Sequence, residues 1–234
     1  MAKSNIIKNF INSNMDINTA LQNLMAILYC LEDENLINWA NKELSGYDSI
    51  NELPEYRKLK GRVMASYIVG NMKYSNAPFI ISHLDDDIQE NLININLYSS
   101  ISTLEEMKNK GESRIGKPIP PEFYILLQEN TNAHIIEASV NTDLSSINDV
   151  ISKVRVKILK TLLFLEKEFG NLDELDIDIS IKNKEELKNI VQHIHFNLYD
   201  NSIKIGDGNK IKGSNITTNK WSILSIIKNN FFKK

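Results

Sequence analysis

Four carboxylates and a histidine gather in one short segment of the chain, and together they have the chemistry of a metal site. They are His83, Asp85, Asp86, Asp87 and Glu90. Such side chains can hold Mg²⁺ or Mn²⁺, which would make the chain a metal-dependent nuclease-like toxic enzyme. The pattern is equally typical of a helix N-terminus, because Ser82 is a natural N-cap and acidic residues in a first turn complement the helix dipole. We favour the helix interpretation and expect no metal or other cofactor.

A second candidate metal pair is His193 with His195. Residues at positions i and i+2 share a face on a strand, but on a helix they diverge by about 200°. The apolar pattern around Leu187, Ile190 and Ile194 is helical. We therefore expect the two imidazoles to point apart instead of binding one ion.

Three aromatic residues, Trp39, Tyr47 and Tyr56, and two opposite charges, Glu43 and Arg57, lie within nineteen residues of the chain. One interpretation is a polar pocket that recognises a ligand. In the other, the planar fork of Arg57 pairs with Glu43 beneath the aromatic rings and fixes the end of a helix. We favour the packing interpretation.

The last fifteen residues, Lys220–Lys234, have the pattern of an amphipathic helix. Its apolar face would consist of Trp221, Leu224, Ile227 and Phe231. Three hypotheses suit such a face: packing on the same chain, docking to a partner or a second copy, and attachment to an anionic membrane surface.

No familiar catalytic motif is readable. The chain has no G-x-S-x-G elbow, and its G-D-G-N run lacks the lysine of a phosphate-binding loop. The single cysteine, Cys30, has no identifiable histidine partner and no second cysteine for an intramolecular disulfide. We therefore favour a non-enzymatic role.

Composition predicts a soluble globular protein, with 42% hydrophobic and 24% charged residues in 234. A net charge of −3 gives no reason to expect nucleic-acid binding. No apolar run comes near the length of about 18 residues that a membrane-spanning helix needs, and we expect a cytoplasmic location.

Periodicity and capping residues place the helices that must position these groups. The predicted helices cover residues 16–28, 34–44, 101–107, 121–127, 143–169 and 183–195. Along the longest, an apolar stripe contains Ile147, Ile151, Val154, Ile158, Leu162 and Leu165, and Gly170 ends it. Arg155 stands in this helix, and we expect it to meet a neighbouring carboxylate or a ligand.

Strands are predicted at Arg62–Val69, Leu92–Tyr98 and Leu175–Ile181, with breaks at Gly70–Asn71 and Asn76–Pro78. Short β rungs are predicted for Ser202–Ile216, which carries Gly, Asp and Asn at turn positions. The expected fold class is α+β. A mainly helical domain with a small antiparallel sheet, residues 1–170, precedes a β-rich and helical extension, residues 171–234.

The segment W-A-N-K-E-L-S-G-Y, followed by L-P-E-Y-R, resembles the signature of the AbiTii domain, a bacterial domain linked with abortive infection and phage defence. Later matches are S-I-S-T-L-E-E-M, P-I-P-P-E and V-R-V-K-I-L-K-T-L-L-F-L-E-K-E, so the resemblance spans residues 15–170. It implies a setting in phage defence and brings no catalytic residues.

These observations together predict a non-catalytic binding and assembly protein of phage defence. The expected partners are further copies of the chain, joined through residues 171–234, and a phage component or a neighbouring defence protein. The alternatives are the metal-dependent effector centred on His83 and a membrane-surface effector acting through residues 220–234.

Overall fold

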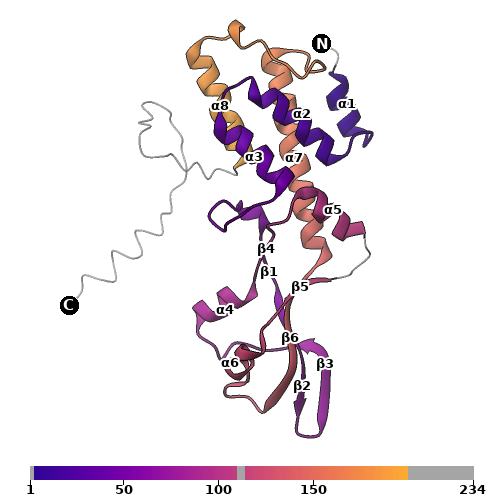
Figure 1. The fold of residues 1–234 in the computed structure, drawn as a ribbon, viewed down its shortest axis with the longest axis vertical. Helices are drawn as coiled ribbons and strands as arrows, with labels where there is room; N and C mark the ends of the chain where they lie inside the picture. The colour runs from indigo at the N-terminus through magenta and orange to yellow at the C-terminus, as the bar shows by residue number, and fades with distance from the viewer. Residues whose placement is uncertain (1–2, 110–113, 200–234) are drawn as a thin grey trace, which may run out of the picture. The chain divides into compact units, whose positions relative to one another are not determined.

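The computed structural model describes residues 3–109 and 114–199, all within one unit, Met1–Ser202 (Figure 1). The helices of these ranges are α1 (Asn5–Ile11), α2 (Ile17–Tyr29), α3 (Glu34–Ser45), α4 (Asp86–Ile93), α5 (Ile101–Asn109), α6 (Tyr124–Gln128), α7 (Leu144–Phe169) and α8 (Lys184–Leu198). The strands are β1 (Lys58–Lys60), β2 (Arg62–Val69), β3 (Met72–Pro78), β4 (Asn94–Asn96), β5 (Arg114–Pro118) and β6 (Ala133–Asp143). Short 3₁₀ turns cover Glu55–Arg57, Pro121–Phe123 and Ile179–Ile181. The α+β fold class predicted from the sequence is confirmed.

The long helix α7 is the centre of the helical part and packs against α1, α2, α5 and α8 (Figure 1). All six residues of its predicted apolar stripe are buried. The helix ends at Gly170, whose φ of 95° is the positive value that glycine adopts without steric cost. Because the stripe packs against four helices, its apolar side chains are removed from water in one continuous core, and this burial stabilises the fold.

Local capping signals placed three other helices correctly. Asp16 accepts a hydrogen bond from the Thr19 backbone at the start of α2. Asn183 and Glu186 form the predicted capping box at the start of α8. Helix α3 ends before Gly46, at φ 100°, as expected.

The N-terminal helix α1 is fixed by polar contacts from the far end of α7. The backbone N–H and hydroxyl of Ser4 both donate to Glu166 Oε1, each at 2.6 Å. Asp173 accepts from the Ile6 backbone at 3.2 Å, and Ser4 Oγ accepts from the Leu172 backbone at 3.0 Å. The bonds from the Ser4 and Ile6 backbones satisfy donors that a helix N-terminus otherwise leaves unpaired.

Two antiparallel sheets complete the described residues. The larger has the order β3-β2-β6-β5, and the smaller pairs β1 with β4. Strand β6 ends at Asp143, which is also the N-cap of α7, so strand and helix follow each other with no loop between them.

Three strand predictions need correction. Asn76–Pro78 is the end of β3 and not a break, because an edge strand tolerates proline and Pro78 still pairs with Met64. The predicted strand Leu92–Tyr98 shrinks to β4, since α4 continues to Ile93. Leu175–Ile181 forms no strand: it ends in the 3₁₀ turn Ile179–Ile181, and Leu175, Ile177 and Ile179 pack on the helical core. Residues 202–216 and 220–234 lie outside the described ranges.

Candidate functional site

Glycine and proline place the polar residues of the Trp39–Arg57 segment together. After α3, the backbone at Gly46 lies so close to the segment that follows β4 that an added Cβ would be 2.8 Å from the Tyr98 carbonyl oxygen. The Tyr47 backbone N–H then donates to that same carbonyl at 2.8 Å. Pro54 precedes the 3₁₀ turn that brings Arg57 back against α3.

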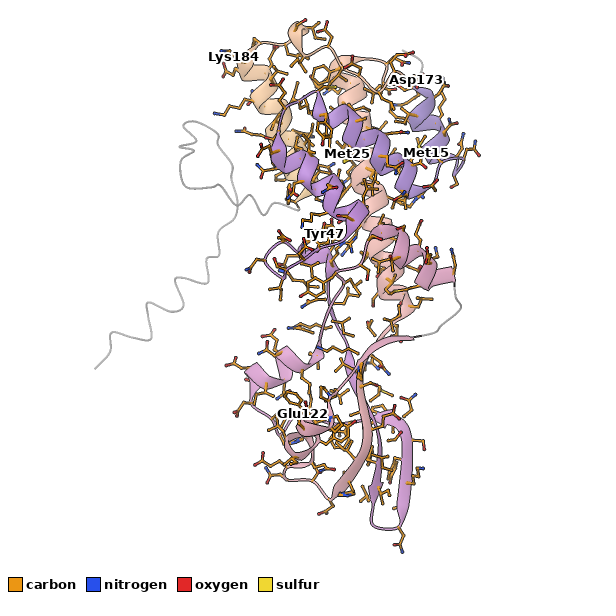
Figure 2. All side chains as sticks on the ribbon, in the orientation of Figure 1. Met15, Met25, Tyr47, Glu122, Asp173 and Lys184 are labelled. Carbon is orange, nitrogen blue, oxygen red and sulfur yellow. The ribbon has the colours of Figure 1, made fainter. Side chains whose placement is uncertain are left out.

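These elements assemble five side chains, Trp39, Glu43, Tyr47, Tyr56 and Arg57, which we call the Glu43–Arg57 cluster. Arg57 binds Glu43 with two bonds, Nη2 to Oε2 at 2.5 Å and Nε to Oε1 at 3.1 Å. The hydroxyls of Tyr47 and Tyr56 both donate to Glu43 Oε1 at 2.6 Å. Trp39 Nε1 donates to the Tyr56 hydroxyl at 3.1 Å. Figure 2 shows Tyr47 at the junction between α3 and the β1–β4 pair.

Arg57 also reaches across to the chain that follows β4. Its Nη1 donates to the Leu97 carbonyl at 3.1 Å and to the Ser99 carbonyl at 2.6 Å. The guanidinium lies 4.9 Å from the centre of the Tyr47 ring. One side chain therefore joins α3, the 3₁₀ turn and the segment leading into α5.

The cluster is closed to solvent. Glu43 and Arg57 are fully buried, and none of the three aromatic residues exposes more than 7% of its surface. Burial, and then the Glu43 charge, raise the pKa of both tyrosines, so their hydroxyls remain protonated donors. Burial opposes the charge of Arg57, but Glu43 outweighs it and raises the arginine pKa. The pair is thus a buried internal contact held by two hydrogen bonds, which is the packing arrangement favoured from the sequence.

One buried residue that contacts the Glu43–Arg57 cluster was not predicted from the sequence. Lys157 of α7 is 5% exposed, and its ammonium lies 5.2 Å from the centre of the Tyr56 ring. The same ammonium donates to the Asn197 carbonyl at the end of α8, at 2.9 Å. Lys157 lies three residues after Val154 and four before Thr161, so helical spacing places it on the buried stripe of α7. This spacing could have predicted its burial.

Arg155 lies apart from the cluster. Its guanidinium packs 4.7 Å from the centre of the Phe10 ring, and its Nη2 donates to the Phe10 carbonyl at 3.4 Å. The residue therefore holds α1 against α7.

The acidic segment before α4 has the geometry of a helix start. Asp85 occupies the N-cap position, and Asp86 and Asp87 lie in the first turn. The cap predicted at Ser82 is wrong by three residues. Glu90 binds Lys60 at 3.1 Å. Over the described ranges, no three His, Cys, Asp or Glu side chains come close enough to share a metal ion.

The two histidines of α8 diverge, as the helical spacing predicted. His193 stacks on Phe164 with ring centres 4.0 Å apart. His195 Nε2 lies 3.1 Å from Asp33 Oδ1, at the start of α3. Both histidines thus contact neighbouring helices instead of each other.

The candidate interaction face of Trp221, Leu224, Ile227 and Phe231 lies outside the described residues. Among the helices that the structure describes, none combines the length and apolarity needed to cross a bilayer.

Comparison with known families agrees with the resemblance seen in the motifs. The AbiTii family matches residues 4–192, a range that includes the Glu43–Arg57 cluster, Arg155 and most of α8. Neither the curated proteins nor the solved structures that were searched match the chain. Because the match covers most of the sequence, the chain belongs to the AbiTii family, which associates it with abortive infection and phage defence in bacteria.

Proposed function

We propose that this chain is a non-catalytic binding and assembly protein of anti-phage defence. It self-associates through its C-terminal extension, residues 171–234, and the assembly binds a phage component or a neighbouring defence protein. Family membership supports the setting. The buried bonding of the residues that carry the family resemblance supports a structural role for them, and the apolar pattern of residues 220–234 motivates the assembly role.

The observation that carries this proposal is the bonding of Glu43. Its two oxygens accept four hydrogen bonds from three side chains of the same cluster. A catalytic carboxylate must reach a substrate proton or a metal, whereas Glu43 is fully buried and both of its oxygens already accept hydrogen bonds within the cluster. The cluster is therefore suited to fix the framework on which a binding surface is carried.

The first part of the extension is firmly attached to this framework. Helix α8 packs against α7 and α3. Tyr199, just after α8, donates from its hydroxyl to the Asn35 carbonyl at 2.8 Å. The apolar residues between Lys220 and Lys234 are proposed to join one copy to another.

Light scattering on the full-length chain tests this proposal. We expect a defined oligomer for the wild type and a monomer for Leu224→Lys/Ile227→Lys, because charges on an apolar face oppose its burial. The matched control Ser222→Lys/Asn229→Lys adds the same charge on the opposite side of the helical pattern and should leave the oligomer intact.

Plating efficiency of phage on cells that carry each variant gives the functional readout. Loss of protection with the first pair and retention with the control would support assembly as the active state. A wild type that stays monomeric while it protects cells would reject the proposed self-association.

A further inference from the structure

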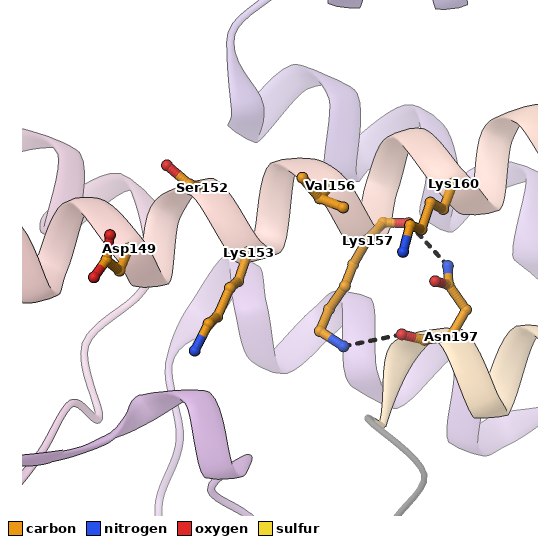
Figure 3. A pocket seen from close by; sticks show the side chains of 7 residues that line it. All are labelled: Asp149, Ser152, Lys153, Val156, Lys157, Lys160 and Asn197. Carbon is orange, nitrogen blue, oxygen red and sulfur yellow. Dashed lines mark hydrogen bonds between the residues drawn. The ribbon is translucent and has the colours of Figure 1, made fainter.

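A cavity of about 330 Å³ lies on α7 beside the C-terminal end of α8 (Figure 3). Its wall includes three lysines of one helix, Lys153, Lys157 and Lys160. Positions i, i+4 and i+7 fall on one face of a helix, so the three residues form a basic stripe. This volume is in the range of small-molecule sites, which runs from about 300 to 1,000 Å³.

The rear of the cavity is held by reciprocal bonds between α7 and α8. Lys157 donates to the Asn197 carbonyl at 2.9 Å, and the Asn197 amide donates to the Lys157 carbonyl at 3.2 Å (Figure 3). Asn197 also donates to Thr161 Oγ1 at 2.7 Å. The carbonyl of Asn197 is one of those that a helix C-terminus leaves unpaired, so Lys157 caps α8 and joins the two helices that form this wall.

Lys153 and Lys160 are the groups that remain available to a ligand. Both are exposed, and over the described ranges neither forms a hydrogen bond or an ion pair. Their backbone positions are about 10 Å apart along the helix axis, a gap that two flexible side chains can close around a bound anion. Asp149 is the one carboxylate in the wall. The wall is therefore basic although the whole chain is acidic.

We propose that this cavity binds a small molecule that carries two or more phosphate groups. Lys153 and Lys160 hold the phosphates, because lysine serves as a point charge for phosphate oxygens. Val156, which is 49% exposed, and the aliphatic stems of the lysines form an apolar floor for an organic part of the ligand. The proposal does not depend on self-association or on a defence role.

Charge argues against the chain's own C-terminal residues as the occupant. Residues 200–234 contain seven lysines and two aspartates, so they carry the same sign of charge as the stripe. A macromolecular partner is also less suited, because stable protein interfaces bury about 800 Å² on each side, far more than a cavity of this size offers.

Calorimetric titration of the full-length chain at low salt, without divalent cations, tests the proposal. The probes are pyrophosphate, ATP and a short single-stranded oligonucleotide. We expect pyrophosphate and ATP to bind the wild type and Lys153→Ala/Lys160→Ala to bind at least about tenfold more weakly. Lys184→Ala/Lys188→Ala removes two exposed lysines at positions i and i+4 of α8 and should bind like the wild type.

Each outcome decides the proposal. Tighter binding of ATP than of pyrophosphate, with the difference reduced by Val156→Thr, supports a nucleotide-type ligand on the apolar floor. Equal affinities support an inorganic polyphosphate. No binding by either probe, unchanged binding in Lys153→Ala/Lys160→Ala, or preference for the oligonucleotide would overturn it.

Discussion

Arg57 Nη2 and Glu43 Oε2 lie 2.5 Å apart, and both side chains have no solvent exposure. A buried pair of this kind is costly to desolvate, and its attraction repays that cost only when the remaining donors and acceptors are also bonded. Here the carbonyls of Leu97 and Ser99 accept from Arg57, and two tyrosine hydroxyls donate to Glu43. The pair therefore requires the correct arrangement of three separate chain segments.

Removing one member of this pair should destabilise the fold strongly. We expect Arg57→Met to lower the free energy of unfolding by about 3–5 kcal/mol, because Glu43 would remain buried without its counter-charge. Urea denaturation measures the loss. Lys58→Ala removes a partner from the exposed pair with Glu55 and should change stability by less than about 1 kcal/mol.

A double-mutant cycle separates the pair from its surroundings. Glu43→Gln/Arg57→Met should be less destabilised than the sum of its single changes, with a coupling free energy of about 2 kcal/mol. Additive single effects would show that the two charges do not depend on each other.

Gly46 should not tolerate a side chain. Gly46→Ala would place a Cβ 2.8 Å from the Tyr98 carbonyl at a φ of 100°, and we expect a loss of about 1–3 kcal/mol. Gly70 also has a positive φ, 57°, but open space around it, so Gly70→Ala should cost about 1 kcal/mol. Thermal unfolding of both variants gives the comparison, and equal losses would contradict the role of the close approach.

Acid should release α1 from α7. Burial acts to raise the pKa of Glu166, but hydrogen bonds from Ser4 and Lys3 outweigh it, and the pKa falls below its ordinary value of 4.5. A lowered pKa contributes stability that is complete above the unfolded value and is lost as the pH falls through the folded value. The pKa of Asp173, which binds the backbone of Ile6, is lowered in the same sense.

The measurement is the free energy of unfolding between about pH 6 and pH 3. The protection factors of the α1 amides against hydrogen exchange, corrected for the pH dependence of the intrinsic rate, should fall over the acidic end of this range. Glu166→Gln keeps an acceptor for Ser4 without the titrating group, so its stability should fall less steeply with acid. An identical slope in the variant would assign the acid sensitivity to other carboxylates.

Loss of the Lys157 ammonium should loosen the end of α8. We expect Lys157→Met to lower stability by about 1–2 kcal/mol and to speed hydrogen exchange in the last turn of α8, because the Asn197 carbonyl would lose its donor. Lys160→Met changes an exposed lysine of the same helix and should have little effect on stability.

Features set by neighbouring residues were predictable from the sequence. The cap of α2 and the capping box of α8 depend on side chains three positions from their partners, and the C-terminus of α7 depends on Gly170. The Glu43–Arg57 pairing was also predictable, because arginine near a glutamate among aromatic residues suits a bidentate buried contact.

Features that depend on distant segments were not predictable in this way. The alternation in Leu175–Ile181 indicated a strand, but a strand needs a partner and the segment packs on helices instead. Strand β6 was not predicted from the sequence, although this segment contains the apolar residues Ile135, Ala138 and Val140, which are buried in the structure. Its ladder with β2 joins residues 64 to 79 positions apart, as in the pair Val63 and Val140, which are 77 apart.

The direct passage from β6 into α7 has a mechanical consequence. With Asp143 as both the last strand residue and the helix cap, no linker can absorb a rotation between sheet and helix. A rotation of the sheet would therefore also rotate α7. Residues of α7 lie beside the Glu43–Arg57 cluster, form the lysine stripe and bind the start of α1, so all three would be affected.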